Sequence, residues 1–561
     1  MTASFTLPPA VVLIFGGLIL PLLNERLRWL VLLGAPLLTL YCVWQVPDGV
    51  ILQANYLGYE LALVKGDALS RLFATVFAIM AFAGGLFALN QNRVVELASA
   101  FCYAGSAIGV VFAGDLITVF IFWELMAIAS TLVVWSAGAY ARGAGLRYAA
   151  IHFLGGVLLM AGIAGEIAAN GSLSFTKMAL DSVPRGLILA GFLINAGAPP
   201  LSAWLPDAYP ESSWSGMVFL SAFTTKTAVY VLLRGFPGTE LLIYVGLFMV
   251  FYGIVYAILE NDMRRILAYS IINQAGFMVT GIGIGTELAL NGAAAHAFAH
   301  IIYKALLLMS AGSVLYMTGK RKCTDLGGLF RTMPLTATCG IIGALSISAF
   351  PLTSGFVSKS MISDAAGIQH LAVVWFLLTA ATAGVFLHAG IKFPWFVFFQ
   401  KDSGLRPSEP PWNMRLAMIF FSMLCIGIGI NPGPLYAILP YPVDFVPYTG
   451  SHVVLMLQLL LFSGLAFFLM LGWLKRTLTI TLDVDWFYRV FGVVMTRRLD
   501  CLLEAGWANL VNAAGRSAHD FANGIRRLHG PDSILARTWP TGAMAFWTTI
   551  MLATYLILSY L

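Results

Sequence analysis

Three residues that can carry protons interrupt one apolar stretch, "HAFAHIIYKALL", at residues 296 to 307. His296, His300 and Lys304 follow one another at intervals of four residues. Because an α-helix turns about 100° per residue, all three fall within an arc of about 80°, on a stripe about 12 Å long. An imidazole titrates near about pH 6.5, and a lysine removed from water loses its proton more readily. The pattern therefore favours the transfer of protons along one face of a helix.

The composition indicates that this helix lies in a membrane. Of the 561 residues, 59% are hydrophobic and only 10% are charged, whereas about 25% of the residues of a soluble domain are charged. Apolar runs of about 20 residues, long enough to cross a hydrocarbon layer of ~30 Å, recur along the whole chain. We expect an all-α polytopic membrane protein. The net charge of +6 includes no basic run that would indicate nucleic acid binding.

About 16 apolar spans can be assigned. Their approximate centres are Phe15, Leu37, Ile79, Gly105, Ile121, Leu158, Leu193, Thr225, Val250, Gln274, Tyr303, Leu345, Ala380, Phe420, Phe462 and Ile550. Loops after odd-numbered spans carry most of the basic residues, for example Arg93 and Arg264, and the positive-inside rule places such loops in the cytoplasm. The acidic loop "PDAYPESS" does not fit. The rule places the N-terminus outside, and we expect the protein in a bacterial cytoplasmic (inner) membrane. That N-terminus has no basic region before its apolar run, so it is interpreted as a first span.

Motifs for cofactors and metals are missing from the sequence. The six cysteines form no CxxC pair, and there is no GxGxxG, Walker or HExxH motif. This argues against an iron–sulfur cluster, haem attachment or a nucleotide site. His296 and His300 lack the carboxylate or third histidine that a metal site would need. We expect no cofactor and no metal, and no redox or hydrolytic site on this chain.

Other ionisable residues lie inside the predicted spans, where a charge costs about 2.5–3.5 kcal/mol. They are Glu124, Lys226, Lys359, His388 and Lys392. Structural alternatives exist, since a membrane histidine can form an interhelical hydrogen bond and a lysine near a helix end, such as Lys392, can extend to the interface. Several such groups in one chain favour an ion pathway.

Two segments predict interrupted helices. "NAGAPPLSAWLPD" places Pro199 and Pro200 inside an apolar span, and "SAFPLTSGFVSK" does the same with Pro351 and Gly355. Proline removes an amide and opens the helix, and open backbone is tolerated at membrane depth where it is buried in protein or lines a cavity. Two such breaks are typical of inverted-repeat transporters. The alternative is a simple proline kink.

Four motifs occur in order over about residues 60 to 430. They are "APPLSAWLPDAYPESSWSGMVFLSAFTTKTAVYVLLR", "DMRRILAYSIINQAGFM", "HAFAHIIYKALLLMSAG" and "SISAFPLTSGFVSK". They resemble the signatures of the antiporter-like subunits found in respiratory complex I and in Mrp-type multisubunit Na+/H+ antiporters, and are most similar to the D-type subunit of the Mrp antiporters. The resemblance implies about 14 core transmembrane helices with two inverted five-helix repeats and discontinuous helices.

The resemblance also implies a chain of charged residues at the middle of the membrane. Glu124 matches the glutamate at its start, Lys226 matches the central lysine, and Lys359 matches the lysine of the second broken helix. The histidines and lysine of the opening stretch match the helix that links the two halves.

Two positions depart from the family pattern. Asn195 stands where the family usually has a lysine paired with the glutamate, and Ser202 stands where it has a histidine. Asparagine can neither carry a proton nor neutralise Glu124. Either another cation partners Glu124, or Glu124 is protonated more of the time.

The expected order of parts includes a long segment outside the core. The parts are N-terminal transmembrane helices (1–95), an ion-translocating core (96–430), a C-terminal core helix (431–475), a cytoplasmic lateral segment (476–540) and a last transmembrane helix (541–561). The lateral segment mixes apolar residues with arginine at helical intervals, which is typical of an amphipathic helix at a membrane surface. It either lies on the membrane alone or braces neighbouring subunits.

The sequence thus predicts an ion-translocating subunit of a multisubunit Na+/H+ antiporter, in which protons move along the buried glutamate, lysines and histidines. Two alternatives stay open. One is a proton-pumping subunit of a complex I-like NADH-quinone oxidoreductase or a membrane-bound hydrogenase. The other is a structural subunit with a degenerate channel. The expected partners are other membrane subunits, the lipid bilayer, H+ and, for an antiporter, Na+.

Overall fold

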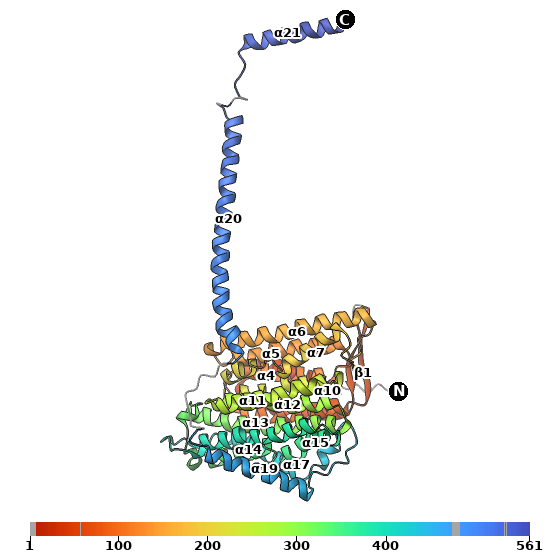
Figure 1. Ribbon diagram of the computed structural model, residues 1–561, viewed down its shortest axis with the longest axis vertical. Coiled ribbons are helices and arrows are strands. Elements are labelled where there is room, and N and C mark those ends of the chain that lie inside the picture. The colour runs from red at the N-terminus through yellow and green to blue at the C-terminus, as the bar shows by residue number, and fades with distance from the viewer. Residues whose placement is uncertain (1–6, 57, 474–482, 532, 534–535) are drawn as a thin grey trace. The chain divides into compact units, whose positions relative to one another are not determined.

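Long apolar helices, running side by side, make up most of the fold (Figure 1). The structure, a computed structural model, describes residues 7–56, 58–473, 483–531, 533 and 536–561. Within these residues, thirteen helices are long and apolar enough to cross a membrane, and three shorter apolar helices accompany them. Each of the sixteen contains the centre predicted for one span. The prediction of an all-α polytopic membrane protein is confirmed.

Two compact units divide the chain, residues 1–485 and 486–561. The helices of the first unit are α1 (Pro9–Ile19), α2 (Glu25–Gln45), α3 (Ala68–Phe87), α4 (Val94–Phe112), α5 (Leu116–Trp135), α6 (Arg142–Asn170), α7 (Val183–Ala196), α8 (Trp204–Ala208), α9 (Gly216–Leu220), α10 (Thr224–Gly235), α11 (Leu241–Leu259), α12 (Met263–Ile284), α13 (Glu287–Thr318), α14 (Pro334–Ile347), α15 (Ser354–Ile368), α16 (Ala372–Val385), α17 (Trp412–Ile430), α18 (Gly433–Tyr436) and α19 (Gly450–Leu469). The second unit contains α20 (Gly492–His529) and α21 (Thr541–Tyr560).

Short 3-10 and π segments extend or join these helices. The 3-10 segments are η1 (Leu20–Leu22), η2 (Ala88–Asn90), η3 (Ala139–Ala141), η4 (Tyr209–Glu211), η5 (Cys323–Asp325) and η6 (Leu329–Arg331), and the π segments are η7 (Phe386–Lys392), η8 (Trp395–Phe399) and η9 (Phe487–Phe491). The lateral segment predicted at 476–540 begins with residues 476–482, which lie outside the described residues.

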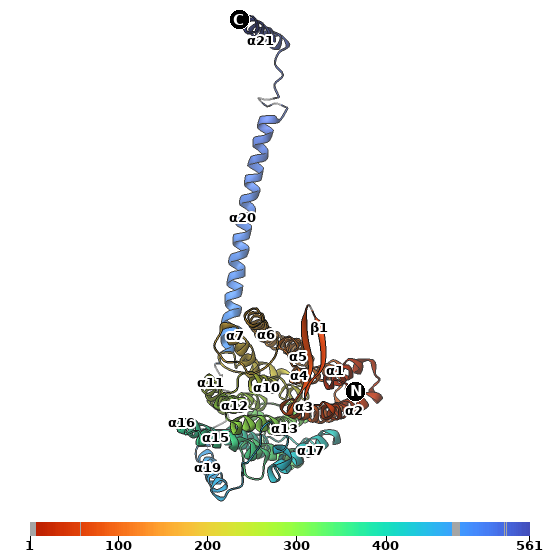
Figure 2. The ribbon, with the colours of Figure 1, turned by 90° about the vertical axis from the view of Figure 1, so that its right-hand side faces the viewer.

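The core of the first unit is built around α10, α12 and α13, which lie among the other helices (Figure 2). The spans containing α10 and α12 are completely buried, and α13 is nearly so. In contrast, only 28% of the span containing α2 and 17% of the span containing α19 is buried. Apolar exposure suits contact with lipid, so the polar residues of the central helices are kept away from the bilayer.

A β-hairpin that the sequence analysis did not predict lies between α2 and α3. Strands β1 (Gly49–Tyr56) and β2 (Tyr59–Gly66) pair antiparallel, with Gly49 opposite Gly66 and Tyr56 opposite Tyr59. The stretch joins two membrane spans and is too short and too polar to be a third. Gly114 N donates to Ala62 O over 2.9 Å, so the hairpin is attached to the loop between α4 and α5.

Both proline segments lie between helices. The first helix ends at Ala196, where Gly197 takes a left-handed conformation (φ 82°), and the chain becomes helical again at Trp204. Ile194 O, near the end of α7, accepts hydrogen bonds from Gly197 N at 3.1 Å and from Trp204 Nε1 at 2.9 Å, which ties the two sides of the break together. The second break separates Ile347 from Ser354.

The acidic loop that did not fit the charge rule is neutralised by arginines. Asp207 forms an ion pair with Arg147 at 2.7 Å, and Glu211 forms one with Arg321 at 2.9 Å. Both arginines belong to loops or helix ends that the charge rule assigns to the cytoplasm. The loop therefore shares their side of the membrane, and its acidity reflects local pairing.

Candidate ion pathway

The stripe on α13 is completely buried. His296, His300 and Lys304 each have 0% of their surface exposed. His296 Nε2 lies 3.1 Å from Gln274 Oε1 on α12, and its Nδ1 lies 3.1 Å from Ser358 Oγ on α15. The stripe therefore connects the central helix to two of its neighbours through polar contacts.

The other two members of the stripe differ in their contacts. Lys304 Nζ donates to Ser270 Oγ over 2.7 Å. The two ring nitrogens of His300 have no hydrogen-bond partner among the described residues. The charges of Lys226 and Lys304 both act on His300. His300 is thus a buried imidazole without a polar partner among the described residues, and it lies within electrostatic range of both lysines.

Lys226 lies in the first turn of α10, directly after the break between α9, which ends at Leu220, and α10, which begins at Thr224. Its amine donates to Ser221 O over 2.7 Å and to Thr225 Oγ1 over 3.0 Å, and the residue is 1% exposed. Ser221 is the C-cap of α9. The last carbonyls of a helix lack helical partners and form the negative end of its dipole. They stabilise an ammonium group there without a carboxylate.

Lys359 on α15 repeats this arrangement at the second proline break. Its amine donates to Ile347 O, the last residue of α14, over 2.8 Å. The amine also lies 4.7 Å from the centre of the Phe277 ring. In the part of the chain that the structure describes, no carboxylate forms an ion pair with Lys226 or Lys359.

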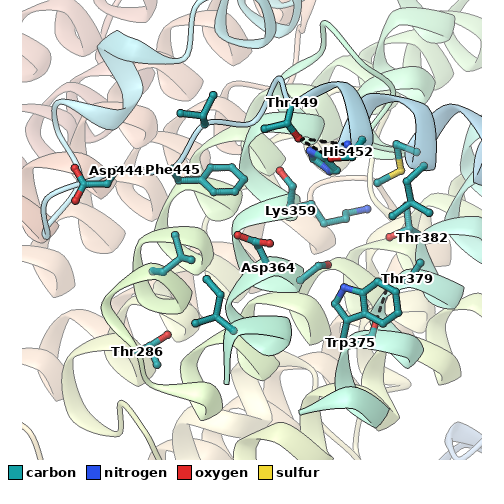
Figure 3. A pocket seen from close by; sticks show the side chains of 18 of the residues that line it. Thr286, Lys359, Asp364, Trp375, Thr379, Thr382, Asp444, Phe445, Thr449 and His452 are labelled. Carbon is teal, nitrogen blue, oxygen red and sulfur yellow. Dashed lines mark hydrogen bonds between the residues drawn. The ribbon is translucent and has the colours of Figure 1, made fainter. Parts of the chain in front are cut away.

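A cavity of about 880 Å³ adjoins Lys359 (Figure 3). Asp364 and Asp444, both exposed, line it together with His452, and the lysine side chain extends into it. The His452 ring stacks on Phe356, with the ring centres 4.5 Å apart. Lys359 lines this cavity, although only 1% of the residue is exposed.

Glu124 and Asn195 each pack against α6, Glu124 from α5 and Asn195 from α7. Glu124 on α5 is half-buried, and its Oε1 has no hydrogen-bond partner among the described residues. A Cβ added at Gly156 would lie 1.9 Å from that oxygen, so the carboxylate packs directly against the glycine. Asn195 is buried on α7, and its Oδ1 accepts a hydrogen bond of 2.8 Å from His152 Nδ1.

His152 is a residue that the sequence analysis missed. It is 1% exposed and lies on α6, one turn before Gly156. Because Asn195 Oδ1 can only accept, Nδ1 carries the hydrogen, and Nε2 of the neutral ring has a lone pair that can take a proton. The sequence did contain a signal for it, since His152 is an ionisable residue inside the apolar stretch "AAIHFLGGVLL" of a predicted span.

The two secondary candidates on the π segment η7 have local contacts. His388 Nδ1 donates to Gly384 O over 2.9 Å. Lys392 Nζ donates to Ala257 O at 3.1 Å and Glu260 O at 2.6 Å, and also to Ile258 O. Lys392 is buried, so it does not extend to an interface. It closes the C-terminal end of α11 and has a structural role there.

Comparison with known proteins identifies the family of this chain. The family described as NADH:quinone oxidoreductase/Mrp antiporter, transmembrane, matches residues 113–387. Over 346 residues the chain is 32% identical to the D-type subunit of the Na(+)/H(+) antiporter of Alkalihalophilus pseudofirmus, an alignment that covers 56% of this chain and 67% of that protein. The chain belongs to the NADH:quinone oxidoreductase/Mrp antiporter family. The matched region contains α5, the central helices and α15.

Other matches extend the similarity to different assemblies. The chain is 30% identical over 390 residues to the A/B-type subunit of a probable K(+)/H(+) antiporter of Rhizobium meliloti, covering 65% of this chain but only 39% of that protein. The fold resembles a chain of an archaeal membrane-bound sulfane sulfur reductase (TM-score 0.72, 23% identity, 99% of both chains). It also resembles a chain of the Mrp complex from Dietzia (TM-score 0.76, 22% identity, 93% of this chain and 63% of that one). The chain is thus an antiporter-like membrane subunit of the kind found in Mrp or complex I-like assemblies.

Proposed function

We propose that this chain carries protons within a multisubunit monovalent cation/proton antiporter, with Na+ as the exchanged cation. The observation that carries the proposal is the buried series Lys226, His300, Lys304 and Lys359, which runs from α10 through α13 to α15. Buried ionisable groups within a membrane are costly and commonly mark ion pathways. The name of the Alkalihalophilus relative, a Na(+)/H(+) antiporter, supports this choice of cation.

The two lysines on interrupted helices suit a proton carrier. Each amine is held by the carbonyl end of a helix, Ser221 O for Lys226 and Ile347 O for Lys359. Each position accepts an ammonium group without fixing it in a tight ion pair, so the proton can leave. Because the groups are close, protonating one lowers the proton affinity of the next, and the sites titrate as a coupled set.

One end of the series adjoins a cavity. Lys359 adjoins the 880 Å³ cavity, through which a proton would pass to or from one side of the membrane. We place Glu124, with Asn195 and His152, at the other end of the series, on the half-buried face of α5 where a neighbouring subunit would contact it. We also place the N-terminus outside and the basic loops in the bacterial cytoplasm, by the positive-inside rule.

The second unit supports an assembly of several subunits. Helix α20 has 38 residues and exposes both apolar residues, such as Leu503 and Trp507, and arginines, such as Arg497 and Arg516. An amphipathic helix of this length would bind along neighbouring subunits or a membrane surface. We propose that it braces adjacent membrane subunits and that α21 is a last membrane span.

A second candidate function is proton pumping within a redox-driven complex. The match to the sulfane sulfur reductase chain over 99% of both chains favours it, because that protein belongs to an archaeal respiratory membrane complex. In that case electron transfer in partner subunits would supply the energy, and the same buried series would carry the protons.

Ion flux in membrane vesicles that contain the whole complex tests the proposal. A pH-sensitive acridine dye would report proton movement after Na+ is added, in wild type, Lys226→Ala and Glu124→Ala, with exposed Lys177→Ala as the matched control. We expect a Na+-driven pH change without any reductant, lost in the first two variants and kept in the control. A pH change that needs an electron donor would establish the redox pump. Normal flux in both relay variants would leave only a structural role.

A further inference from the structure

A second buried carboxylate, Glu96, lies in the first turn of α4 and takes no part in the pathway described above. It is 0% exposed. Its Oε1 accepts hydrogen bonds from Ser213 Oγ at 2.5 Å, Ser215 Oγ at 2.5 Å and Gln91 Nε2 at 3.1 Å, and its Oε2 accepts one from Ser136 Oγ at 3.4 Å. All four donors are neutral. Among the described residues no cation forms an ion pair with this carboxylate.

A cavity of about 590 Å³ reaches two of the donors that hold Glu96. Gln91 and Ser213 line it, together with Arg93, Arg264 and Glu211. Water in this cavity is therefore one side chain away from the carboxylate. Arg93 and Arg264 are among the basic residues that the positive-inside rule assigns to the cytoplasm, so the cavity would open on that side.

The loop that carries Ser213 is held rigidly. The guanidinium of Arg264, which is 3% exposed, donates to Pro210 O at 3.0 Å, Ser212 O at 2.8 Å and Ser213 O at 2.7 Å. Gly216 N donates to Ser213 Oγ over 2.9 Å. The hydroxyl groups around the carboxylate are thus fixed in place before any ion arrives, which lowers the cost of binding one.

Polar groups continue from Glu96 towards Lys226. Tyr103 lies seven residues after Glu96 on α4, which places it on the same helix face about 10 Å further along. Tyr103 OH lies 2.5 Å from Thr224 Oγ1, and the next residue, Thr225, accepts the hydrogen bond from Lys226 Nζ. Ser99, which is also buried, lies between them on that face of α4.

We propose that Glu96 is a proton-loading site at the mouth of the pathway, fed from the 590 Å³ cavity through Ser213 and Gln91. A hydronium ion in the cavity gives one proton to the carboxylate. The carboxylic acid then passes a proton along the Tyr103 face of α4 to the neutral amine of Lys226, and the carboxylate is restored. No other reactant is required. The inference rests on the proposed function of this chain as a proton carrier.

The test compares Glu96→Gln, Glu96→Asp and Ser213→Ala in the whole complex, with exposed Glu240→Gln as the matched control. We expect Glu96→Gln to lower the initial rate of the Na+-driven pH change at least about tenfold, because the amide cannot take up a proton. Glu96→Asp keeps a carboxyl group and should retain most of the rate. Ser213→Ala should move the pH of half-maximal transport, whereas Glu240→Gln should leave both the rate and that pH unchanged.

The other outcomes separate this inference from the proposed function. If Glu96→Gln transports normally while Lys226→Ala is inactive, the loading site is wrong and the relay stands. If Lys226→Ala is also fully active, the proposed function itself fails. If the Gln and Asp variants are equally inactive and less of the complex assembles, Glu96 has a structural role and the inference is overturned. Infrared difference spectra between two pH values add a direct readout, since the protonated carboxyl band should be lost in Glu96→Gln.

Discussion

His152 Nδ1 donates a hydrogen bond of 2.8 Å to Asn195 Oδ1, at the position where the family pattern predicts a lysine. The histidine comes from α6, and its next turn carries Gly156, against which the carboxylate of Glu124 packs. A group that can take up a proton thus lies one helix turn from the glycine that Glu124 contacts, although the lysine is missing. Among the described residues, His152 Nε2 and Glu124 Oε1 both lack a hydrogen-bond partner, and no cation forms an ion pair with Glu124. Of the two explanations that the sequence left open, this favours a Glu124 that is protonated more of the time.

Substitution of His152 tests whether its imidazole carries protons. We expect His152→Ala to reduce cation-driven proton flux at least about tenfold, because the first half then loses the ionisable imidazole that lies one helix turn from Gly156. The double variant His152→Ala/Asn195→Lys should recover part of the flux, since the new lysine supplies a cation at the family position. The dye assay in vesicles measures both. Equal flux in wild type and His152→Ala would show that the imidazole only packs against its neighbours.

Arginine in place of the two pathway lysines separates charge from proton transfer. Lys226→Arg and Lys359→Arg keep a positive charge and can still donate to the helix carbonyls, but guanidinium does not release its proton in proteins. We expect complexes that assemble normally and transport no protons. Lys177→Arg, at an exposed position, is the control. Transport by either pathway variant at the wild-type rate would mean that the lysine acts as a fixed charge.

Because Gly156 packs closely against Glu124, we expect proton transport to be sensitive to a single methyl group added at Gly156. The Cβ of Gly156→Ala would lie 1.9 Å from Glu124 Oε1, so the carboxylate must move. We expect proton flux to fall while assembly is preserved, because the half-buried side chain can move outwards. Gly427→Ala is the control, since no atom lies within 4 Å of its added Cβ. Unchanged flux in Gly156→Ala would show that the position of Glu124 is not critical.

The ion pair between Asp67 and Arg234 predicts a pH-dependent stability. Burial raises the pKa of Asp67. The charge of Arg234 and the hydrogen bonds from Ser70 and Arg234 together lower the pKa by more than burial raises it, so it lies below its ordinary value. A depressed carboxyl pKa contributes stability above the unfolded-state pKa, and this stability is lost as the pH falls through the folded-state pKa.

The matching variant is Asp67→Asn, which keeps the N-cap of α3 but removes the charge. Thermal unfolding of the detergent-purified protein between about pH 3 and about pH 7 measures the effect. We expect the variant to unfold at a lower temperature than wild type near neutral pH, with the difference shrinking as the pH falls. Asp67→Ala should be less stable still, by about 0.5–2 kcal/mol, because the helix cap is also lost. A difference that does not change with pH would exclude the ion pair as its source.

Cys501 offers a test of the membrane orientation. It is the exposed cysteine of the six, on α20 of the lateral segment. If this segment is cytoplasmic, a membrane-impermeant maleimide should label the isolated protein in inside-out vesicles and not in right-side-out vesicles, and Cys501→Ser should remove the signal. Labelling only from the opposite side would reverse the predicted topology.

The sequence determined the parts of this protein that depend on local patterns. Apolar runs located thirteen helices long enough to cross a bilayer and three shorter apolar helices among the described residues, because a long apolar run is a property of consecutive residues. The four-residue spacing placed His296, His300 and Lys304 on one face of a helix, and that face proved to be buried. The hairpin of β1 and β2 was missed, since it lies in a connection between two spans where no membrane length constrains the pattern.

Only the tertiary structure decided which groups meet. Lys226 and Lys359 bind the carbonyl ends of α9 and α14, and no spacing within the sequence predicts a contact between a side chain and a helix end that lies across a break. Glu96 went unnoticed because a carboxylate in the first turn of a helix is ordinary, and its burial depends on serines more than 100 residues away. Periodicity fixes the face on which a residue lies. The neighbours that determine its charge and its chemistry come from distant segments, and only the packed fold brings them together.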